Sequence, residues 1–246
     1  TLRAWRDLMR ESLPLAGVVL FSTAMARFDW IFIGLFVSAA KLAEYSFAYK
    51  GFEVASLPLQ ALAPLLLPAF ARRLGGANTA PAPAAATAAP AAAPAAHDPR
   101  LQRLLTIELC TAWGIFLLMN LLWSPWVDAL TQGRYGHVNA RTVFWLSLVL
   151  PVYFMNNFLW TIHFALGRLT WIFKAFVVGF VLNVAGDIIL IPLYGNEGAA
   201  VAYLLAMLVQ TLLYHKGIRE VSLTRAWVTL LAGGALAGLL LWAATR

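Results

Sequence analysis

Seven long apolar stretches, separated by short polar segments, dominate the pattern of this chain. A run of about 20 apolar residues is long enough to cross a bilayer as a helix. The predicted spanning helices cover Leu13–Val37, Ala43–Ala71, Leu101–Trp123, Val143–Leu166, Leu169–Leu193, Ala199–Leu213 and Ala226–Ala244. The pattern therefore predicts an all-α integral membrane protein, a polytopic bundle of about seven transmembrane helices.

The polar segments divide the chain into four parts. Residues 1–12 form a charged, amphipathic lead-in, residues 13–74 the first pair of helices, and residues 101–246 five further helices. Residues 75–100 consist mostly of Ala and Pro, so they offer few large apolar side chains to bury and their prolines forbid a continuous helix. We expect this segment to be a disordered cytoplasmic loop.

Composition strengthens the membrane assignment and excludes other classes. Of the 246 residues, 61% are hydrophobic and 12% are charged, whereas soluble domains average about 25% charged residues. The single Cys110, placed in an apolar span, excludes an internal disulfide and a cysteine-based metal cage. In a soluble protein, the net charge of +7 would suggest nucleic acid. Here the basic residues lie in short loops, so we expect no nucleic-acid partner.

The distribution of Lys and Arg predicts how the helices are oriented. The basic residues of one set of alternate loops are Arg3, Arg6, Arg10, Arg72, Arg73, Arg100, Arg103, Arg168, Lys174, Lys216, Arg219 and Arg225. Those of the other set are Lys41, Arg134, Arg141 and Arg246. The positive-inside rule therefore places the N-terminus of this chain in the cytoplasm and its C-terminus on the outer side.

Four charged residues lie inside the first two apolar stretches. Arg27 and Asp29 belong to the first, and Lys50 and Glu53 to the second. A charge near the membrane centre costs about 2.5–3.5 kcal/mol on insertion scales, so it is usually paired or faces a water-filled cavity. At a rise of about 1.5 Å per residue the four share a similar depth, which makes Arg27–Glu53 and Asp29–Lys50 contacts feasible. The cluster indicates a polar interior, and two structural ion pairs are the alternative interpretation.

Further polar residues lie in the later helices. Asn156 and Asn157 fall near the middle of one predicted span, and Asn183 and Asp187 lie in the next. Asparagines in membrane helices commonly form interhelical hydrogen bonds, whereas a lone carboxylate needs a cation, a proton or water. Glu108 lies near the inner end of its helix, so we expect it to snorkel to the cytoplasmic face.

The second helix also carries Pro58, Pro64 and Pro68. Proline removes a backbone donor and kinks a helix, and broken helices recur in transporters. The three prolines therefore favour this helix as the bending element of the first pair.

Motifs for catalysis are missing from the sequence. It has no Walker A loop, no GxSxG elbow, no HExxH and no metal-ligand spacing among its four histidines. We therefore expect no enzymatic activity, no catalytic residue, no metal site and no cofactor.

Three stretches resemble a known family. ARFDWIFIGLFVSAAKLAEYSFAYKGFE (26–53), closed by LLLPAFARR (65–73), is similar to helices seven and eight of bacterial O-antigen-type polysaccharide flippases. WVDALTQGRYGHVNA (126–140) is similar to that family's loop between helices nine and ten. NVAGDIILIPLYGNEGAAVAYLLAMLVQTLLYH (183–215) is similar to helices eleven and twelve. The family belongs to the multidrug/oligosaccharidyl-lipid/polysaccharide exporter superfamily.

The resemblance implies a function. The chain would be the C-terminal lobe of a two-lobe, alternating-access flippase in the bacterial inner membrane, with the N-terminal lobe as its partner. The implied substrate is an undecaprenyl-pyrophosphate-linked oligosaccharide for cell-surface polysaccharide such as lipopolysaccharide O-antigen, and a glycan polymerase is a candidate partner. Arg27 and Lys50 would contact the headgroup. Asp29, Glu53, Asp187, Asn156, Asn157 and Asn183 would support the cavity or couple transport to a proton or sodium ion.

The charge balance keeps alternatives open. The ionisable residues inside the spans are slightly acidic, with Arg27 and Lys50 opposed by Asp29, Glu53, Glu108 and Asp187. Net acid suits a cation-coupled multidrug exporter, and lipid II flippases are a further related group. A non-transporting membrane scaffold, in which the same residues form structural ion pairs, is the alternative from another class.

Overall fold

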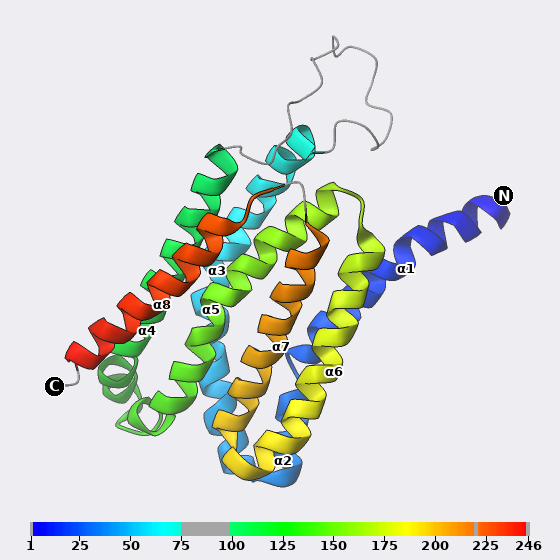
Figure 1. The fold of residues 1–246 in the computed structure, drawn as a ribbon. Coiled ribbons are helices and arrows are strands. Elements are labelled where there is room, and N and C mark those ends of the chain that lie inside the picture. The colour runs from blue at the N-terminus through cyan, green and yellow to red at the C-terminus, as the bar shows by residue number, and fades with distance from the viewer. Residues whose placement is uncertain (1, 75–98, 219–220, 245–246) are drawn as a thin grey trace.

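The computed structural model describes residues 2–74, 99–218 and 221–244, and within these residues it contains helices and no strand. The helices are α1 (Leu2–Met25), α2 (Phe28–Phe36), α3 (Ala39–Leu74), α4 (Pro99–Thr131), α5 (Gly136–Ala165), α6 (Leu169–Tyr194), α7 (Asn196–Gly217) and α8 (Thr224–Ala244). Figure 1 shows them as one elongated bundle. The predicted all-α bundle is therefore confirmed.

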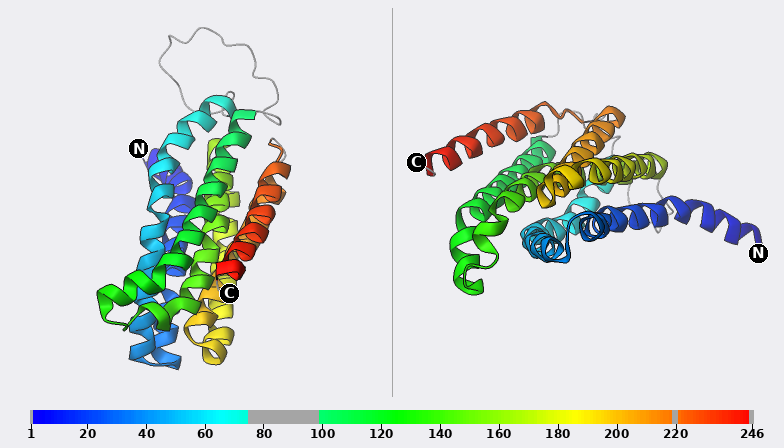
Figure 2. Two further views of the ribbon diagram at one scale, coloured as in Figure 1. Left: turned by 90° about the vertical axis from the view of Figure 1, so that its left-hand side faces the viewer. Right: turned by 90° about the horizontal axis from the view of Figure 1, so that it is seen from below.

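Six helical stretches among the described residues are long and apolar enough to cross a membrane, counting Leu15–Phe36, which joins the C-terminal part of α1 to α2, as one of them. The charged α3 is not among these six, yet it runs the height of the bundle beside them in Figure 2. The count of about seven predicted spans thus corresponds to these six stretches together with α3.

The helix ends gather at two opposite ends of the bundle. The N-terminal end of α1, the turn between α5 and α6 and the start of α8 lie at one end in Figure 1, whereas the turns after α2, α4 and α6 lie at the other. Residues that the sequence predicts to be cytoplasmic therefore share one end. The predicted loop of residues 75–100 lies outside the described residues, apart from Pro99 and Arg100, which begin α4.

The first span is interrupted, which corrects the prediction of one continuous helix over Leu13–Val37. Ala26 and Arg27 form a turn between α1 and α2, and the Arg27 backbone has φ −137° and ψ −17°. Just before the turn, the Ser22 and Thr23 hydroxyls both donate to the carbonyl of Val19, at 3.0 and 2.8 Å. Such bonds back to the helix compete with the backbone ladder and bend helices. Residues 2–12, predicted as a separate lead-in, are the first part of α1.

The second helix stays continuous despite its prolines. α3 runs unbroken through Pro58, Pro64 and Pro68 and curves towards its C-terminal end in Figure 2. The bending expected of this helix is thus a curve, while the break belongs to the neighbouring span.

The connection between α4 and α5 is shorter than predicted, because helix replaces most of the expected loop over residues 126–140. α4 contains Pro125 and bends near this end in Figure 2. A turn with positive φ at Gln132 and Gly133 then leads into α5. The Asp128 carboxylate accepts the backbone N–H groups of Gly136 and His137, at 2.8 and 2.9 Å, and so satisfies unpaired donors at the start of α5.

α5 lies at the centre of the bundle. It packs against α3, α4 and α7, and most of its residues are buried. α8 covers α4, whereas α1 covers α6, and Figure 2 shows α1 and α8 at opposite edges of the bundle. This arrangement leaves the break between α1 and α2 facing α3, where the candidate site lies.

Candidate functional site

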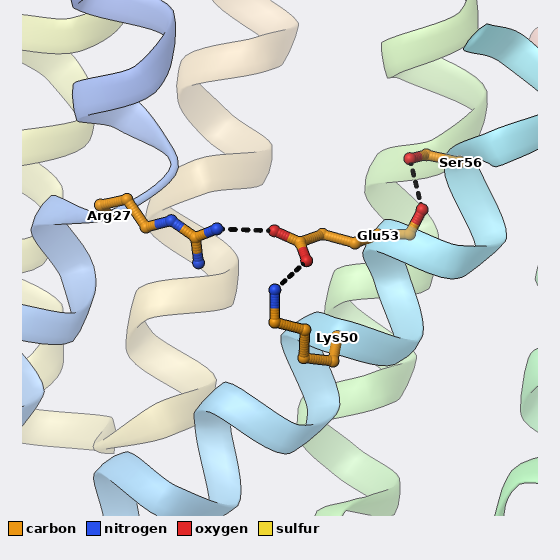
Figure 3. A network of polar contacts seen from close by, with 4 residues as sticks. All are labelled: Arg27, Lys50, Glu53 and Ser56. Atoms are coloured by element: carbon orange, nitrogen blue, oxygen red, sulfur yellow. Dashed lines mark hydrogen bonds and ion pairs between the residues drawn. The ribbon is translucent and has the colours of Figure 1, made fainter.

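Arg27 occupies the break itself and reaches across to α3. Its Nη2 lies 3.0 Å from Oε1 of Glu53, as the depth argument predicted, and Figure 3 shows the side chain spanning the gap between the two helices. The guanidinium also lies over the Trp30 ring, 4.5 Å from its centroid. An ion pair and a cation–π contact together orient this cation.

Glu53 is shared by two cations. Lys50, one turn earlier on α3, places its Nζ 2.5 Å from Oε2 of Glu53, so each carboxylate oxygen has its own basic partner in Figure 3. The side chains remain accessible, with exposed fractions of 43% for Arg27, 59% for Lys50 and 34% for Glu53. We call these three residues the charge network. Its formal charge is +1, and its side chains are accessible to water.

A cavity of about 540 Å³ adjoins the charge network. Arg27 and Glu53 line it together with side chains of α1, α3, α5, α6 and α7. Its other polar lining residues are Ser22, Thr23, Tyr49, Ser56, Gln60, Tyr153, Asn156, Asn157, Tyr203, Gln210 and Tyr214. Polar side chains at membrane depth mark a region that water or a polar ligand occupies.

Asn156 and Asn157 both belong to the cavity wall. The Asn156 amide nitrogen donates to the carbonyl of Met207 at 3.1 Å, which ties α5 to α7. Among the described residues, Oδ1 of Asn156 and Nδ2 of Asn157 have no hydrogen-bond partner although both atoms are buried. Because buried polar groups are rarely left unpaired, these atoms are candidates to bind water or a polar ligand.

Asp29 lies in a different environment, and its predicted contact with Lys50 is wrong. It is buried, accepts the hydroxyl of Tyr45 and accepts the backbone N–H of Trp30 at 2.9 Å. Asp29 follows Arg27 by two residues, so it points away from the charge network. Tyr45, and not Lys50 as predicted, is therefore the side-chain partner of Asp29.

Asp187 and Asn183 form the other half of this buried group. The Asn183 amide nitrogen donates to Asp187 Oδ2 at 2.8 Å, and Asp29 is near enough to act electrostatically on Asp187. Oδ1 of Asp187 and Oδ1 of Asn183 are buried, without a hydrogen-bond partner in the described part of the chain. We call Asp29, Tyr45, Asn183 and Asp187 the carboxylate cluster. None of its members lines the 540 Å³ cavity.

Glu108 corrects another expectation, because it does not snorkel to a surface. Only 3% of the residue is exposed, and neither carboxylate oxygen has a hydrogen-bond partner in the described residues. It follows the first residue of α4 by nine positions, or about 13.5 Å along the helix, too far for a glutamate side chain to reach the end of the bundle.

Two tyrosines of α3 belong to the site although the sequence did not predict them as site residues. Tyr45 holds Asp29, and Tyr49 lines the cavity with its ring 5.8 Å from the Arg27 guanidinium. With Phe52 they stand at i, i+4 and i+7, a spacing that places all three on one helix face. That aromatic stripe beside Lys50 and Glu53 is the signal that would have identified them.

Metal-binding groups are scarce in this site. Within residues 2–74, 99–218 and 221–244, no three His, Cys, Asp or Glu side chains are arranged to hold a metal ion. A cation held by the carboxylate cluster would therefore depend on amide, hydroxyl or backbone oxygens in addition to its two carboxylates.

Comparison with known proteins identifies the fold. No protein-family model matches the chain, and no curated protein sequence matches it either. Among solved structures, it is similar to "Lipid II flippase MurJ, inward closed conformation", with a TM-score of 0.72 and 13% sequence identity over 99% of this chain. The match covers 50% of that protein, so the chain spans about half its length. At this identity the likeness establishes a shared fold with that half of the protein.

Proposed function

We propose that the chain is one lobe, the C-terminal one, of a two-lobe alternating-access flippase. Its cargo would be an undecaprenyl-pyrophosphate-linked oligosaccharide, moved from the cytoplasmic to the periplasmic leaflet of the bacterial inner membrane for cell-surface polysaccharide assembly. The observation that carries this proposal is the pair of cations, Arg27 and Lys50, that share Glu53 beside a cavity lined by both polar and apolar side chains at membrane depth.

The charge network suits a pyrophosphate. Arginine binds phosphate oxygens through two parallel N–H donors, and lysine adds a mobile point charge. Because the two cations share one carboxylate, an arriving diphosphate can take over either partner without leaving Glu53 unpaired. Asn156 and Asn157 then offer amide groups for sugar hydroxyls on the opposite wall.

The carboxylate cluster is the proposed site of ion coupling. Two nearby carboxylates repel each other unless a proton or a cation lies between them. The unpartnered oxygens of Asp187 and Asn183 are hard ligands of the kind that sodium prefers. Asp29 and Asp187 would hold the ion, and Tyr45 would orient Asp29 through its hydroxyl.

Lipid II is the second candidate cargo, favoured by the structural similarity to a lipid II flippase. Both lipids carry a pyrophosphate, so the charge network suits either, and the glycan distinguishes them. The remaining partners in this proposal are the other lobe and a glycan polymerase, with the N-terminus of the chain in the cytoplasm. A multidrug exporter would instead bind cations, and a scaffold would move no cargo.

The test is transport by the two-lobe protein reconstituted in liposomes. We expect Arg27→Ala and Lys50→Ala each to lower the initial rate of lipid-linked glycan translocation by about tenfold or more, the value of one charge-assisted contact. Lys41→Ala is the matched control, because Lys41 forms the same i,i+3 pair with Glu44, at 2.6 Å, away from the cavity.

The outcomes separate the candidates. Oligosaccharide and lipid II substrates, offered separately, identify the glycan, and translocation of a lipophilic cation would instead indicate a multidrug exporter. Unchanged glycan transport in both variants would refute the headgroup role. Full recovery of folding and transport in Arg27→Glu/Glu53→Arg would show that Arg27 and Glu53 act only as a structural ion pair and would refute the headgroup role of Arg27.

A further inference from the structure

A second hollow lies at the end of the bundle where α5 turns into α6 and α7 ends. It measures about 600 Å³, and its lining includes Arg168, Thr170, Trp171, Lys174, Lys216 and Gly217. None of these residues lines the central cavity. Three of them are basic and none is acidic, so the hollow is a concentrated positive site apart from the one discussed above.

The frame of this hollow is fixed by hydrogen bonds between its elements. The Arg168 guanidinium donates to the carbonyl of Gly217 at 2.5 Å, and the Trp171 indole donates to the carbonyl of Leu213 at 3.2 Å. Gly167, with φ +69°, allows the sharp turn that brings α6 back beside α7. The two lysines are therefore held on a defined backbone.

Lys174 and Lys216 are the groups available to a ligand. Both side chains are exposed, and within the described residues neither forms an ion pair. A cation pair that has no acidic partner among the described residues favours an anion with oxygen acceptors, and basic pockets between membrane helices at the cytoplasmic side bind phosphate headgroups. The positive-inside pattern predicts that this end of the bundle is cytoplasmic.

The outer face of α6 indicates that the phosphate belongs to a lipid. Trp171, Lys174, Val178 and Val181 stand at i, i+3, i+7 and i+10, which places them on one helix face. Val178 is 39% exposed and Val181 56% exposed. The hollow thus opens at the head of an outward-facing apolar stripe, and tryptophan is typical of the headgroup level of a bilayer.

We propose that this hollow, the α5–α6 basic pocket, binds the phosphate of an anionic phospholipid from the surrounding leaflet. Lys174 and Lys216 contact the phosphate oxygens, Thr170 offers a hydroxyl, and an acyl chain follows Val178 and Val181 down the face of α6. The lipid is a bound component of the leaflet and is not the transported cargo, so this site does not depend on the proposed function.

The test counts lipids retained by the purified chain. In native mass spectrometry from detergent, we expect one phosphatidylglycerol to bind about tenfold or more tightly than phosphatidylcholine. Lys174→Gln/Lys216→Gln removes this preference, whereas Lys174→Arg/Lys216→Arg keeps it. Arg134→Gln/Arg141→Gln is the matched control, since it removes two exposed positive charges from the other end of the bundle and keeps the preference.

A second measurement needs no variant. Phosphatidylglycerol with a photoreactive acyl chain, incorporated with the wild-type chain into nanodiscs, should label α6 between Lys174 and Leu182. Labelling that avoids this segment would overturn the proposal, as would equal binding of the two lipids. Equal loss of binding in the Arg134/Arg141 control would do so too. Displacement of the lipid by inorganic phosphate at equal concentration would assign the pocket to a soluble phosphate and refute the lipid.

Discussion

The charge network and the carboxylate cluster begin two residues apart, at Arg27 and Asp29, yet they have opposite environments. The three side chains of the network are between one third and three fifths exposed, and they border a cavity. Asp29 and Asp187 are buried, and their partners are a tyrosine hydroxyl and an asparagine amide rather than a cation.

The break in the first span explains why Arg27 and Asp29 have different environments. In a continuous helix, residues two apart point in different directions, and the turn at Ala26–Arg27 lets the first of them leave the helix face altogether. Arg27 then meets the cavity while Asp29 enters the packing between α2, α3 and α6. One interruption thus supplies both an exposed cation and a buried carboxylate.

Removing the buried carboxylate should have the largest effect on stability. Asp29→Ala leaves the fully buried Tyr45 hydroxyl without its acceptor, at a cost of about 2–3 kcal/mol in unfolding free energy. Asp29→Asn keeps an acceptor oxygen and should cost less than half of that. Denaturant unfolding in detergent measures both. The distinction between the two regions fails if Glu53→Ala is as destabilising as Asp29→Ala.

The sequence predicts the bundle because apolar length and loop charge depend on composition along the chain. It also predicts the Arg27–Glu53 contact, since depth follows from helical rise alone. It does not predict the partner of Asp29, because that depends on how α2 and α3 rotate about their axes. Tyr45 lies on the inner face and reaches Asp29, whereas Lys50 lies one turn from Glu53 and bonds there.

The break at Ala26–Arg27 is missed for a related reason. No proline or glycine marks it, and the nearby signals are the Ser22 and Thr23 hydroxyls, which bend a helix only when they bond back to it. Burial of Glu108 is missed because its distance from the helix start depends on α4 beginning at Pro99. The apolar pattern therefore predicts the elements, while breaks and rotations need the packed structure.

Sodium bound at the carboxylate cluster should stabilise the folded chain by an amount between the effect of Asp29→Ala and the Arg27–Glu53 coupling energy. A cation that binds only the folded chain raises the unfolding free energy by about 1.4 kcal/mol at ten times its dissociation constant. We expect sodium chloride, compared with choline chloride at constant pH and ionic strength, to raise the thermal midpoint of the wild type. Asp187→Asn removes one carboxylate and should abolish the shift, whereas Glu53→Gln should preserve it. A shift that persists in Asp187→Asn would place the ion elsewhere, and no shift in the wild type would leave the proton as the proposed coupling ion.

The smallest of these effects should be the coupling energy between Arg27 and Glu53 in the charge network. A double-mutant cycle of Arg27→Ala and Glu53→Ala, measured by denaturant unfolding, should give about 0.2–1 kcal/mol, the range for exposed ion pairs, because solvent screens both side chains. The coupling should fall further at high salt. A coupling energy above about 2 kcal/mol that does not fall at high salt would mean that the ion pair is shielded from solvent, as Asp29 is.

Weak coupling is what a headgroup site requires, since a diphosphate must displace Glu53 from Arg27 and later be released. The same weak pair could not hold two helices together, so a small value also counts against a purely structural role.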